Sequence, residues 1–455
     1  MATACDVLII GDGQAATPLA KALAGHGRQV AVAERHALGG SCVNFGCTPT
    51  KAALASAKVA HQIRHAGDFG IRAAAPEVDF AAVLARAKGI RDEMRASLAK
   101  AFPSDGNPRL IRGHARFIGR SDDGFRLRIG DTEAIAQQVV IDTGTRSLIP
   151  PIDGLGDVSF LDAGNWLDHD ERPQRLAILG GGYIGLEMAQ FYRRMGSAVC
   201  VIESGSHVAE HEDPDVSDAI QGLLEREGVA FRLNSRLERV RRSNGTLELM
   251  AGGERLSATH LFVATGRRPN TDDLGLETVG VKTDDRGFLV VDERLRTSVE
   301  GIWAAGDARG GPMFTHSAWD DGRILESQIL GDGSDTTLRT VPYAIFTDPQ
   351  LGRVGMTERE AGEAGLDCRV GRFDMARNGK AKEIGETDGF IKVVVDADGD
   401  LLLGAAVLAA EGAELVHSYV ELISARLPVS TLRNAIFIHP TLAEAAQSAL
   451  GCVDG

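Results

Sequence analysis

Two copies of one short pattern, 169 residues apart, constrain the fold of this chain more than any other feature. In each copy an apolar run ends in a glycine-rich turn, a helical segment follows, and a second apolar run ends in a glutamate. The first copy extends from Gly11 to Glu34 and the second from Gly180 to Glu203, so that glycine and glutamate are 23 residues apart in both. This order is typical of strand, turn, helix and strand. The sequence therefore predicts two βαβ units in an α/β fold.

Each glycine turn predicts a binding site for a dinucleotide. A strand that runs directly into a helix presents free backbone N–H groups and the positive end of the helix dipole to a pyrophosphate. An acid at the end of the second strand accepts hydrogen bonds from a ribose. Tight packing without a ligand is the alternative, but it does not explain the two glutamates. The expected binding residues are Gly11, Gly13, Ala16 and Glu34 in the first copy and Gly180, Gly182, Gly185 and Glu203 in the second.

Two details distinguish the copies. Ala16 replaces the third glycine of the first copy, at a position that governs helix–strand packing. Glu203 is followed by Ser-Gly-Ser-His, without Arg or Lys. A carboxylate in that setting would repel a 2′-phosphate and pair with a free hydroxyl, so we expect NADH rather than NADPH at the second copy.

Length and charge exclude several classes of protein. A chain of 455 residues is too long for one core, and two to four domains are expected. The net charge of −14 argues against a nucleic-acid partner. No apolar run is long enough to span a membrane, and the first residues lack the pattern of a signal peptide, so we expect a cytoplasmic protein.

The last third of the chain lacks a glycine fingerprint. Strands are expected at 341–346, 389–395 and 401–408, and helices near 357–365, 411–426 and 441–450. This alternation predicts a separate α+β domain.

Cys42 and Cys47 follow the first copy directly, within Gly39-Gly-Ser-Cys-Val-Asn-Phe-Gly-Cys-Thr-Pro-Thr-Lys51. A disulfide needs Cα atoms about 4.4–6.8 Å apart, whereas residues five apart on a regular helix are separated by about 8–9 Å. A bond would therefore require a distorted turn, which the Asn and Gly in the gap would ease, and a helix starting near Pro49 would stabilise a thiolate. Six cysteines are too few for a disulfide scaffold, so a bonded pair in a reducing compartment would be catalytic or sensory.

Two other interpretations of the pair remain open. A zinc site would need four ligands, and no second Cys or His pair lies nearby in sequence, so no metal site is expected. Two inert thiols are the other alternative. Cys5, Cys200 and Cys368 lie in or beside apolar runs and are expected to be buried.

Four further residues are candidates for catalysis. His439 is expected at a loop-to-helix boundary with Glu444 in the helix, and an imidazole oriented by a carboxylate can move the proton that thiol–disulfide exchange requires. The plain alternative is a helix-start feature. Lys51 and Glu187 each lie on the first helical stretch after a turn, so their charges could meet between the two units, or both could be ordinary solvated residues.

Taken together, these segments resemble a known family. The matching segments, in family order, are Gly39 to Lys51 with both cysteines, Gly180-x-Gly-Tyr183-Ile184-Gly-x-Glu187, Ala264-Thr-Gly266-Arg-Arg-Pro-Asn270, Ala305-Gly-Asp307 and His439-Pro-Thr-x-x-Glu444. They are similar to the class I pyridine nucleotide–disulfide oxidoreductases, which include dihydrolipoamide dehydrogenase, glutathione reductase and mercuric reductase.

The resemblance implies two Rossmann-like domains, a C-terminal dimerisation domain and a homodimer. FAD would bind a domain formed by residues 1–149 and 268–334, the pyridine nucleotide would bind 150–267, and 335–455 would form the interface. Cys47 would lie against the flavin, Cys42 would exchange with substrate, and His439 would reach Cys42 of the other subunit. The remaining cofactor contacts it implies are Gly40, Ser41, Lys51, Ala115, Thr143, Gly144 and Asp307 for the flavin nucleotide and Tyr183, Ile184 and Gly266 for the nicotinamide nucleotide.

The expected substrate is a small oxidant, disulfide or metal ion. Cys452 stands without the vicinal partner that mercuric reductases carry near the C-terminus. The segments 314–321 and 341–349 resemble bacterial flavoproteins described as mercuric-reductase-like, some of which reduce oxidants such as hypothiocyanite or Cu(II). Dihydrolipoamide dehydrogenase is the alternative in the same fold, and a flavin-bound redox sensor or structural subunit is the alternative of another class.

Overall fold

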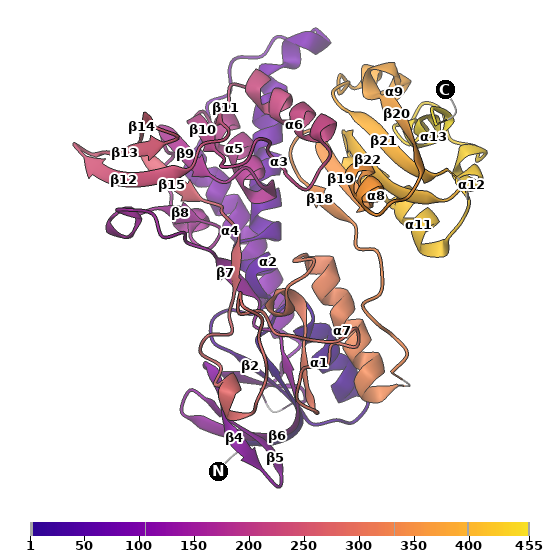
Figure 1. Ribbon diagram of the computed structural model, residues 1–455. Helices are drawn as coiled ribbons and strands as arrows, with labels where there is room; N and C mark the ends of the chain where they lie inside the picture. The colour runs from indigo at the N-terminus through magenta and orange to yellow at the C-terminus, as the bar shows by residue number, and fades with distance from the viewer. Residues whose placement is uncertain (1–2, 105, 332, 398–399, 454–455) are drawn as a thin grey trace.

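The computed structural model describes residues 3–104, 106–331, 333–397 and 400–453, which form three units (Figure 1). The first unit lies at the bottom of the view, the second at the upper left, and the C-terminal unit, in orange and yellow, at the upper right. Two long helices, α3 (Cys47–Arg64) and α4 (Phe80–Ala99), run upward from the first unit beside the second. Within the described residues, no helix is both long and apolar enough to cross a membrane.

The first unit is a seven-stranded mixed sheet in the order β3-β2-β1-β6-β5-β4, with β17 paired to residues 139–141 of β6. Residues 7–10 of β1 are buried on both faces, as expected of a central strand in a parallel sheet. Its elements are β1 (Thr3–Ile10), α1 (Ala16–Gly25), β2 (Val30–Glu34), α2 (Gly40–Asn44), β3 (Arg109–Arg112), β4 (Ala115–Ser121), β5 (Gly124–Ile129), β6 (Thr132–Ile141), β17 (Ile302–Ala304) and α7 (Thr315–Leu330).

The second unit repeats this plan with a parallel sheet in the order β11-β10-β9-β15-β8. A short antiparallel ribbon of β7 and β16 lies at the junction between the two units. The elements of the second unit and of this ribbon are β7 (Thr145–Ser147), β8 (Leu161–Asp162), β9 (Arg175–Leu179), α5 (Tyr183–Arg194), β10 (Ala198–Ile202), α6 (Pro214–Arg226), β11 (Ala230–Arg232), the antiparallel strands β12 (Leu237–Ser243), β13 (Thr246–Ala251) and β14 (Glu254–Ala258), then β15 (His260–Val263) and β16 (Arg267–Pro269).

The C-terminal unit is a five-stranded antiparallel sheet in the order β18-β19-β22-β21-β20, with helices against it. Its elements are β18 (Tyr343–Ile345), β19 (Gln350–Gly355), α8 (Glu358–Glu363), β20 (Cys368–Asp374), α9 (Gly379–Glu383), β21 (Phe390–Asp396), β22 (Leu402–Ala409), α10 (Gly412–Leu415), α11 (His417–Ala425), α12 (Ser430–Arg433) and α13 (Glu444–Gly451). Two units that each contain a parallel βαβ core, followed by an α+β unit, confirm the fold class expected from the sequence.

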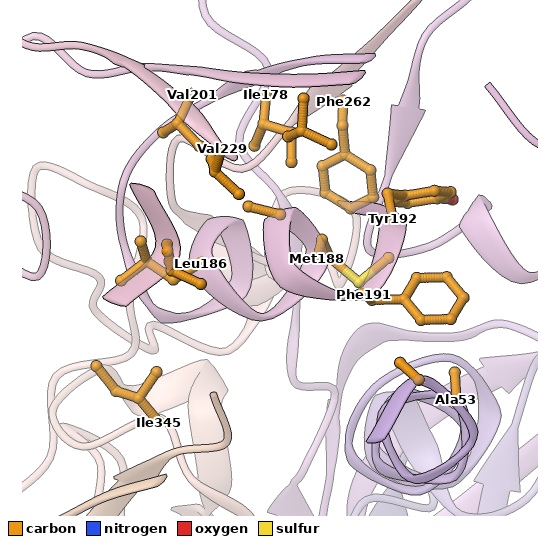
Figure 2. Close-up of a cluster of buried hydrophobic side chains, with 14 of the residues drawn as sticks. Ala53, Ile178, Leu186, Met188, Phe191, Tyr192, Val201, Val229, Phe262 and Ile345 are labelled. Carbon is orange, nitrogen blue, oxygen red and sulfur yellow. The ribbon is translucent and has the colours of Figure 1, made fainter. Parts of the chain in front are cut away.

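A buried apolar cluster joins the three units (Figure 2). Phe191 and Tyr192 of α5 lie between the second sheet and α3, where Ala53 contributes, and Ile345 of β18 joins the same cluster. Removing a buried aromatic ring from such a cluster typically costs about 3–5 kcal/mol of stability. The cluster therefore fixes the start of α5 relative to the start of α3, and both helices contribute to the site described below.

Two local expectations differ from the structure in detail, and three elements were not expected. Helix α3 begins at Cys47 rather than near Pro49, because a proline is tolerated in the first turn, where its missing N–H would have no helical partner. The segment expected as one helix over 411–426 is two helices that meet at Val416, whose carbonyl accepts from the N–H groups of both Tyr419 and Val420. Helix α6 and strands β19 and β20 were not located from the sequence.

Candidate active site

A cavity of about 910 Å³ lies where the first unit meets the starts of α3 and α5 and the C-terminal unit. Both cysteines of the pair line it, and so do the first glycine turn and the starts of α5 and α7. The predicted site residues that line this cavity are Gly11, Gly13, Glu34, Gly40, Ser41, Cys42, Cys47, Lys51, Ala115, Thr143, Gly144, Tyr183, Ile184, Glu187 and Asp307.

The first glycine turn lies at one end of the cavity. Gly11 adopts φ +93°, and a Cβ at this position would come within 2.4 Å of the Asp142 carbonyl oxygen, so only glycine fits. The Glu34 carboxylate accepts hydrogen bonds from the backbone N–H groups of Asp12 (2.9 Å) and His36 (2.6 Å). Ala16 is fully buried at the start of α1 and does not line the cavity.

The second glycine turn has the same local geometry. Gly180 adopts φ +108° beside the Ala264 carbonyl, and Glu203 accepts from the N–H groups of Gly181 (2.7 Å) and Gly205 (2.7 Å). A Cβ at Gly185 would lie 2.0 Å from the Gly180 carbonyl oxygen, so the third position must be glycine here. The predicted residues outside the cavity lining in this unit are Gly180, Gly182, Gly185, Glu203 and Gly266.

The cysteine pair spans a break between two helices. Cys42 lies in α2, the chain leaves helical geometry at Phe45 and Gly46, and Cys47 is the first residue of α3. A residue distant in sequence stabilises this loop: the indole N–H of Trp166 donates a hydrogen bond to the Phe45 carbonyl (2.9 Å). The expected distorted turn is therefore present, and both residues are free thiols in the structure.

The two thiols differ in acidity. The pKa of Cys47 falls from 9.0 to about 6, mainly because Cys42 donates a hydrogen bond to its sulfur and further because of Thr315 and the Lys51 ammonium, which together outweigh the effect of burial. The pKa of Cys42 is raised, first by the same contact with Cys47 and then by burial. In the reduced pair, Cys47 therefore carries the negative charge and Cys42 carries the proton.

Lys51 and Glu187 meet as expected from their positions. The Lys51 ammonium contacts both carboxylate oxygens of Glu187, at 3.0 and 2.8 Å. Glu187 is nearly fully buried and also accepts from the backbone N–H of Phe346 (3.0 Å), whose ring lies 4.5 Å from the ammonium. Three units of the molecule thus fix one positive charge beside Cys47.

The donors around the cavity fit a flavin nucleotide. The Thr143 hydroxyl is buried and has no hydrogen-bond partner among the described residues, so it can serve a bound ligand. The Thr145 hydroxyl donates to the Asp307 carboxylate (2.9 Å), which lines the cavity. The free N–H groups at the first turn suit a pyrophosphate, and Glu34 suits a ribose.

His439 and Glu444 pair with each other but lie away from the cavity. The His439 Nδ1 atom is 3.0 Å from the Glu444 carboxylate, and the imidazole is 78% exposed. The pKa of Glu444 is lowered, first by the backbone N–H of Thr441 and then by His439. Neither residue lines the cavity of its own chain.

Sequence reasoning missed three residues of the site. Asp142 is fully enclosed beside Gly13, accepts from the Ala16 N–H (3.1 Å), and has a pKa well above its usual range, mainly because of burial. Asp12 accepts from Thr17 and from the N–H of Gly39, which ties the glycine turn to the cysteine loop. The third is Thr315, whose hydroxyl oxygen lies 3.2 Å from the Cys47 sulfur. An acid directly after a buried strand was the available signal for Asp142, but Thr315 is brought in from distant sequence.

Comparison with known proteins decides the family. A family model described as pyridine nucleotide-disulphide oxidoreductase matches residues 5–322, and the dimerisation domain of the same family matches residues 341–450. The chain belongs to the pyridine nucleotide–disulfide oxidoreductases. Members of this family are FAD- and NAD(P)H-dependent flavoprotein disulfide reductases, so the enzyme class, the use of a flavin with a pyridine nucleotide and the dimerisation domain expected from the sequence are confirmed.

The relatives cover almost the whole chain. The probable pyridine nucleotide-disulfide oxidoreductase RclA of Escherichia coli is 34% identical and covers 96% of each chain. A mercuric reductase of Streptomyces lividans is 35% identical over 98% of this chain and 96% of its own. A dihydrolipoyl dehydrogenase of Halobacterium salinarum is 33% identical over 99% of this chain and 96% of its own. The solved structure of the Cu(II) complex of HOCl-induced flavoprotein disulfide reductase RclA superposes with a TM-score of 0.91 at 33% identity and covers 100% of both chains.

Proposed function

We propose that this oxidoreductase passes electrons from NADH through FAD to the Cys42–Cys47 pair, and from there to a small oxidant or metal ion. The observation that carries the proposal is the position of Cys47. Its sulfur lines the cavity next to the first glycine turn, its pKa is lowered to about 6, and the Lys51–Glu187 pair lies beside it. A low thiol pKa in a cavity of this size marks a reactive cysteine.

The first unit would hold FAD, which supplies a two-electron carrier between a hydride donor and a dithiol. Glu34 would accept from the ribose, Thr143 and Asp307 would bind along the flavin side, and the N–H groups of the first turn would face the pyrophosphate. The other proposed contacts are Gly11, Gly13, Ala16, Gly40, Ser41, Lys51, Ala115 and Gly144. In this proposal residues 1–149 and 268–334 form the FAD domain, 150–267 the NAD domain and 335–455 the interface.

The cysteine pair would exchange electrons with a balanced uptake of protons. Two electrons and one proton convert the Cys42–Cys47 disulfide into a Cys47 thiolate and a Cys42 thiol. Cys42, which retains its proton in the reduced pair, would then give that proton to a base and react with the acceptor as a thiolate. Cys47 stays beside the cavity and re-forms the disulfide with Cys42 as the two electrons pass to the acceptor.

The second unit would bind NADH in preference to NADPH. Glu203 stands at the end of the second strand with Ser204 and Gly205 after it, and its carboxylate is held by two backbone N–H groups. A fixed negative charge in this position favours a ribose hydroxyl over a phosphate. Gly180, Gly182, Gly185 and Gly266 would contact the nucleotide, with Tyr183 and Ile184 at the nicotinamide end.

The active site would be completed by a second copy of the chain. His439 is exposed on the C-terminal unit, which matches the family's dimerisation domain, and it lies outside the cavity of its own chain. We propose that His439 of a second copy reaches Cys42 and takes its proton, with Glu444 orienting the ring. Replacement of His439 by Ala should lower turnover by about 10²–10⁴-fold and leave reduction by NADH unchanged.

The acceptor proposed here is an oxidant or a metal ion, in the cytoplasm. The similarity to RclA, whose structure is a Cu(II) complex, and to a mercuric reductase supports this choice. Similarity to dihydrolipoyl dehydrogenases keeps lipoamide as the second candidate. A flavin-bound redox sensor would show flavin reduction without sustained turnover.

A panel of acceptors under saturating NADH tests the function. Cu(II), Hg(II), hypothiocyanite, lipoamide and glutathione disulfide are compared in the wild-type enzyme and in Cys42→Ser. We expect the highest turnover with Cu(II) or hypothiocyanite, and loss of that turnover in the variant. A dominant rate with lipoamide would establish the second candidate, and no sustained turnover with any acceptor would establish the sensor.

A further inference from the structure

Thr315 contacts the sulfur of Cys47 from the first turn of α7. Its hydroxyl oxygen lies 3.2 Å from that sulfur, although the two residues are 268 positions apart in the chain. We propose that Thr315 is a catalytic residue that donates a hydrogen bond from its hydroxyl to the Cys47 thiolate and so favours the reduced pair over the disulfide. The inference rests on the redox role proposed above for Cys42 and Cys47.

The neighbours of Thr315 hold it in position. The ring of Phe314 stacks between His316 and Tyr343, with centroids 5.5 Å apart on both sides and nearly parallel planes. His316 Nε2 lies 2.6 Å from the carbonyl oxygen of Pro342 and therefore donates a hydrogen bond to it. The residues on both sides of Thr315 are thus fixed against the strand segment that leads into β18, so the hydroxyl is directed at the sulfur without a free rotation of the segment.

A buried carboxylate fixes the rest of α7. Asp321 is completely buried and accepts from the backbone N–H of Gly306 (2.9 Å), from Arg309 (2.7 and 3.0 Å) and from Arg339 (3.0 Å). These contacts tie the second turn of α7 to the loop that follows β17. The first turn of α7 therefore keeps its distance from Cys47 when the thiol changes its charge.

The hydroxyl has a stronger partner in the reduced pair than in the oxidised pair. Reduction of the disulfide by two electrons and one proton leaves a thiol on Cys42 and a negative charge on Cys47. A hydrogen bond to an ionised acceptor is about twice as strong as a neutral one, and a disulfide sulfur is only a weak acceptor. Thr315 therefore stabilises the product of the reduction more than its starting state.

The helix ends act in the same direction. Cys47 is the first residue of α3, which has 18 residues, and Thr315 is the first residue of α7, which has 16. Neither helix has a side chain that caps its first N–H groups. Both helices thus begin at the contact between Cys47 and Thr315, where a positive helix end favours a thiolate, and the threonine hydroxyl adds a hydrogen bond.

Two substitutions separate the hydroxyl from the shape of the side chain. Thr315→Val keeps the volume and removes the proton donor, and Thr315→Ser keeps the donor. Each holoenzyme is reduced by two electrons, and the long-wavelength absorbance of the Cys47 thiolate beside oxidised flavin is followed against pH. We expect the midpoint in Thr315→Val to rise by about one pH unit, a tenfold loss in ionisation, because a hydrogen bond to a charged group is lost. Thr315→Ser should retain the wild-type midpoint.

A second measurement does not depend on the absorbance of the flavin. The pair is equilibrated with glutathione buffers, trapped by alkylation and counted by mass spectrometry in the presence and absence of FAD. Half-reduction of the pair in Thr315→Val should require a glutathione buffer that is about tenfold more reducing than for the wild type. This equals a reduction potential of the pair about 30 mV more negative. If Thr315→Val binds no flavin, Thr315→Ala is measured in the same way.

The outcomes distinguish this inference from the proposed function. Equal midpoints and equal potentials in wild type and Thr315→Val would overturn the role of Thr315. A wild-type enzyme that shows no thiolate band and no NADH-driven reduction of its thiols would instead overturn the proposed function. A shift of the pH midpoint or of the reduction potential in Thr315→Ser would also contradict the inference, because this variant still has a hydroxyl that can donate to Cys47.

Discussion

The two glycine turns share a backbone but differ in their surroundings. In both, the first glycine faces a carbonyl of the neighbouring parallel strand, and the glutamate accepts from two backbone N–H groups at equivalent positions. Around the first turn the protein places Asp142 and the cysteine loop, and a large cavity follows. At the second turn a Cβ on Gly182 would meet open space.

This difference shows how one motif can serve two nucleotides. The repeated turn and glutamate provide the expected contacts to the phosphates and to a ribose of the nucleotide. The segment after the glutamate differs between the two units and gives each its own surroundings. After Glu34 the chain forms the loop that carries Cys42 and Cys47, and after Glu203 it runs through Ser204 to α6. We infer that the first unit retains its nucleotide as a bound group and that the second exchanges it in each turnover.

Exchange of each glutamate for arginine should affect the two units differently. Glu34→Arg leaves the buried N–H of Asp12 and the partly buried N–H of His36 without an acceptor and should give protein without FAD and with activity at background. Glu203→Arg should retain FAD and change the NADH:NADPH preference by at least about tenfold, because the new charge favours the 2′-phosphate. Flavin content after gel filtration and kcat/KM for both nucleotides are measured, with far-ultraviolet circular dichroism as the control for folding. Normal FAD content in Glu34→Arg, or an unchanged preference in Glu203→Arg, would contradict the assignment.

Exchange between glycine and alanine at the third position should cost more stability in the second turn than in the first. Gly185→Ala brings a Cβ to 2.0 Å from the Gly180 carbonyl and should destabilise the protein by about 1–3 kcal/mol. Ala16→Gly removes only a methyl group at the start of a helix and should cost about 0.5–1 kcal/mol. Urea unfolding of both variants checks the order, and an equal cost would show that the two turns are sterically equivalent.

The cysteine loop of the first unit should make a contribution to the unfolding free energy that depends on pH through the Cys47 thiol. Folding lowers the pKa of Cys47 from 9.0 to about 6, so its contribution in the reduced protein is fully present above pH 9 and is lost as the pH falls through about 6. The difference in unfolding free energy between wild type and Cys47→Ser, measured under reducing conditions, should therefore grow between pH 6 and pH 9. A difference that is constant across this range would mean that the thiolate is not stabilised by the fold.

Asp142 lies at the first glycine turn, and its replacement by Asn should have the smallest effect of these substitutions on FAD content and stability. Burial and the nearby Asp12 hold its pKa well above the usual range, so Asp142→Asn replaces an uncharged acid by an uncharged amide of the same shape. We expect FAD content and thermal stability close to wild type for Asp142→Asn. Asp142→Ala should lose stability, since the Ala16 N–H would lose its carboxyl acceptor and keep only the Gly13 carbonyl at 3.2 Å. Loss of FAD in Asp142→Asn would show that the ionised form is required.

Much of this arrangement was predictable because it depends on local sequence. The βαβ units, the break between Cys42 and Cys47 and the neighbouring positions of His439 and Glu444 follow from spacing within short segments. The Lys51–Glu187 pair was expected from the idea that both turns face one site, and the structure shows the contact. The contact of Thr315 and the role that we propose for His439 in a second copy could not be derived in this way, because they depend on how distant segments pack.

Rapid mixing of the anaerobic enzyme with NADH tests the central claim most directly. In the wild type we expect fast reduction of the flavin, followed by a long-wavelength band as electrons reach the pair. Cys42→Ser should show this band before NADH is added, because Cys47 is already a free thiolate, and Cys47→Ser should bind FAD, accept electrons and show no band at any time. A wild-type enzyme without the band, or a Cys47→Ser variant that retains it, would contradict the path from the second nucleotide site through the first to this cysteine pair.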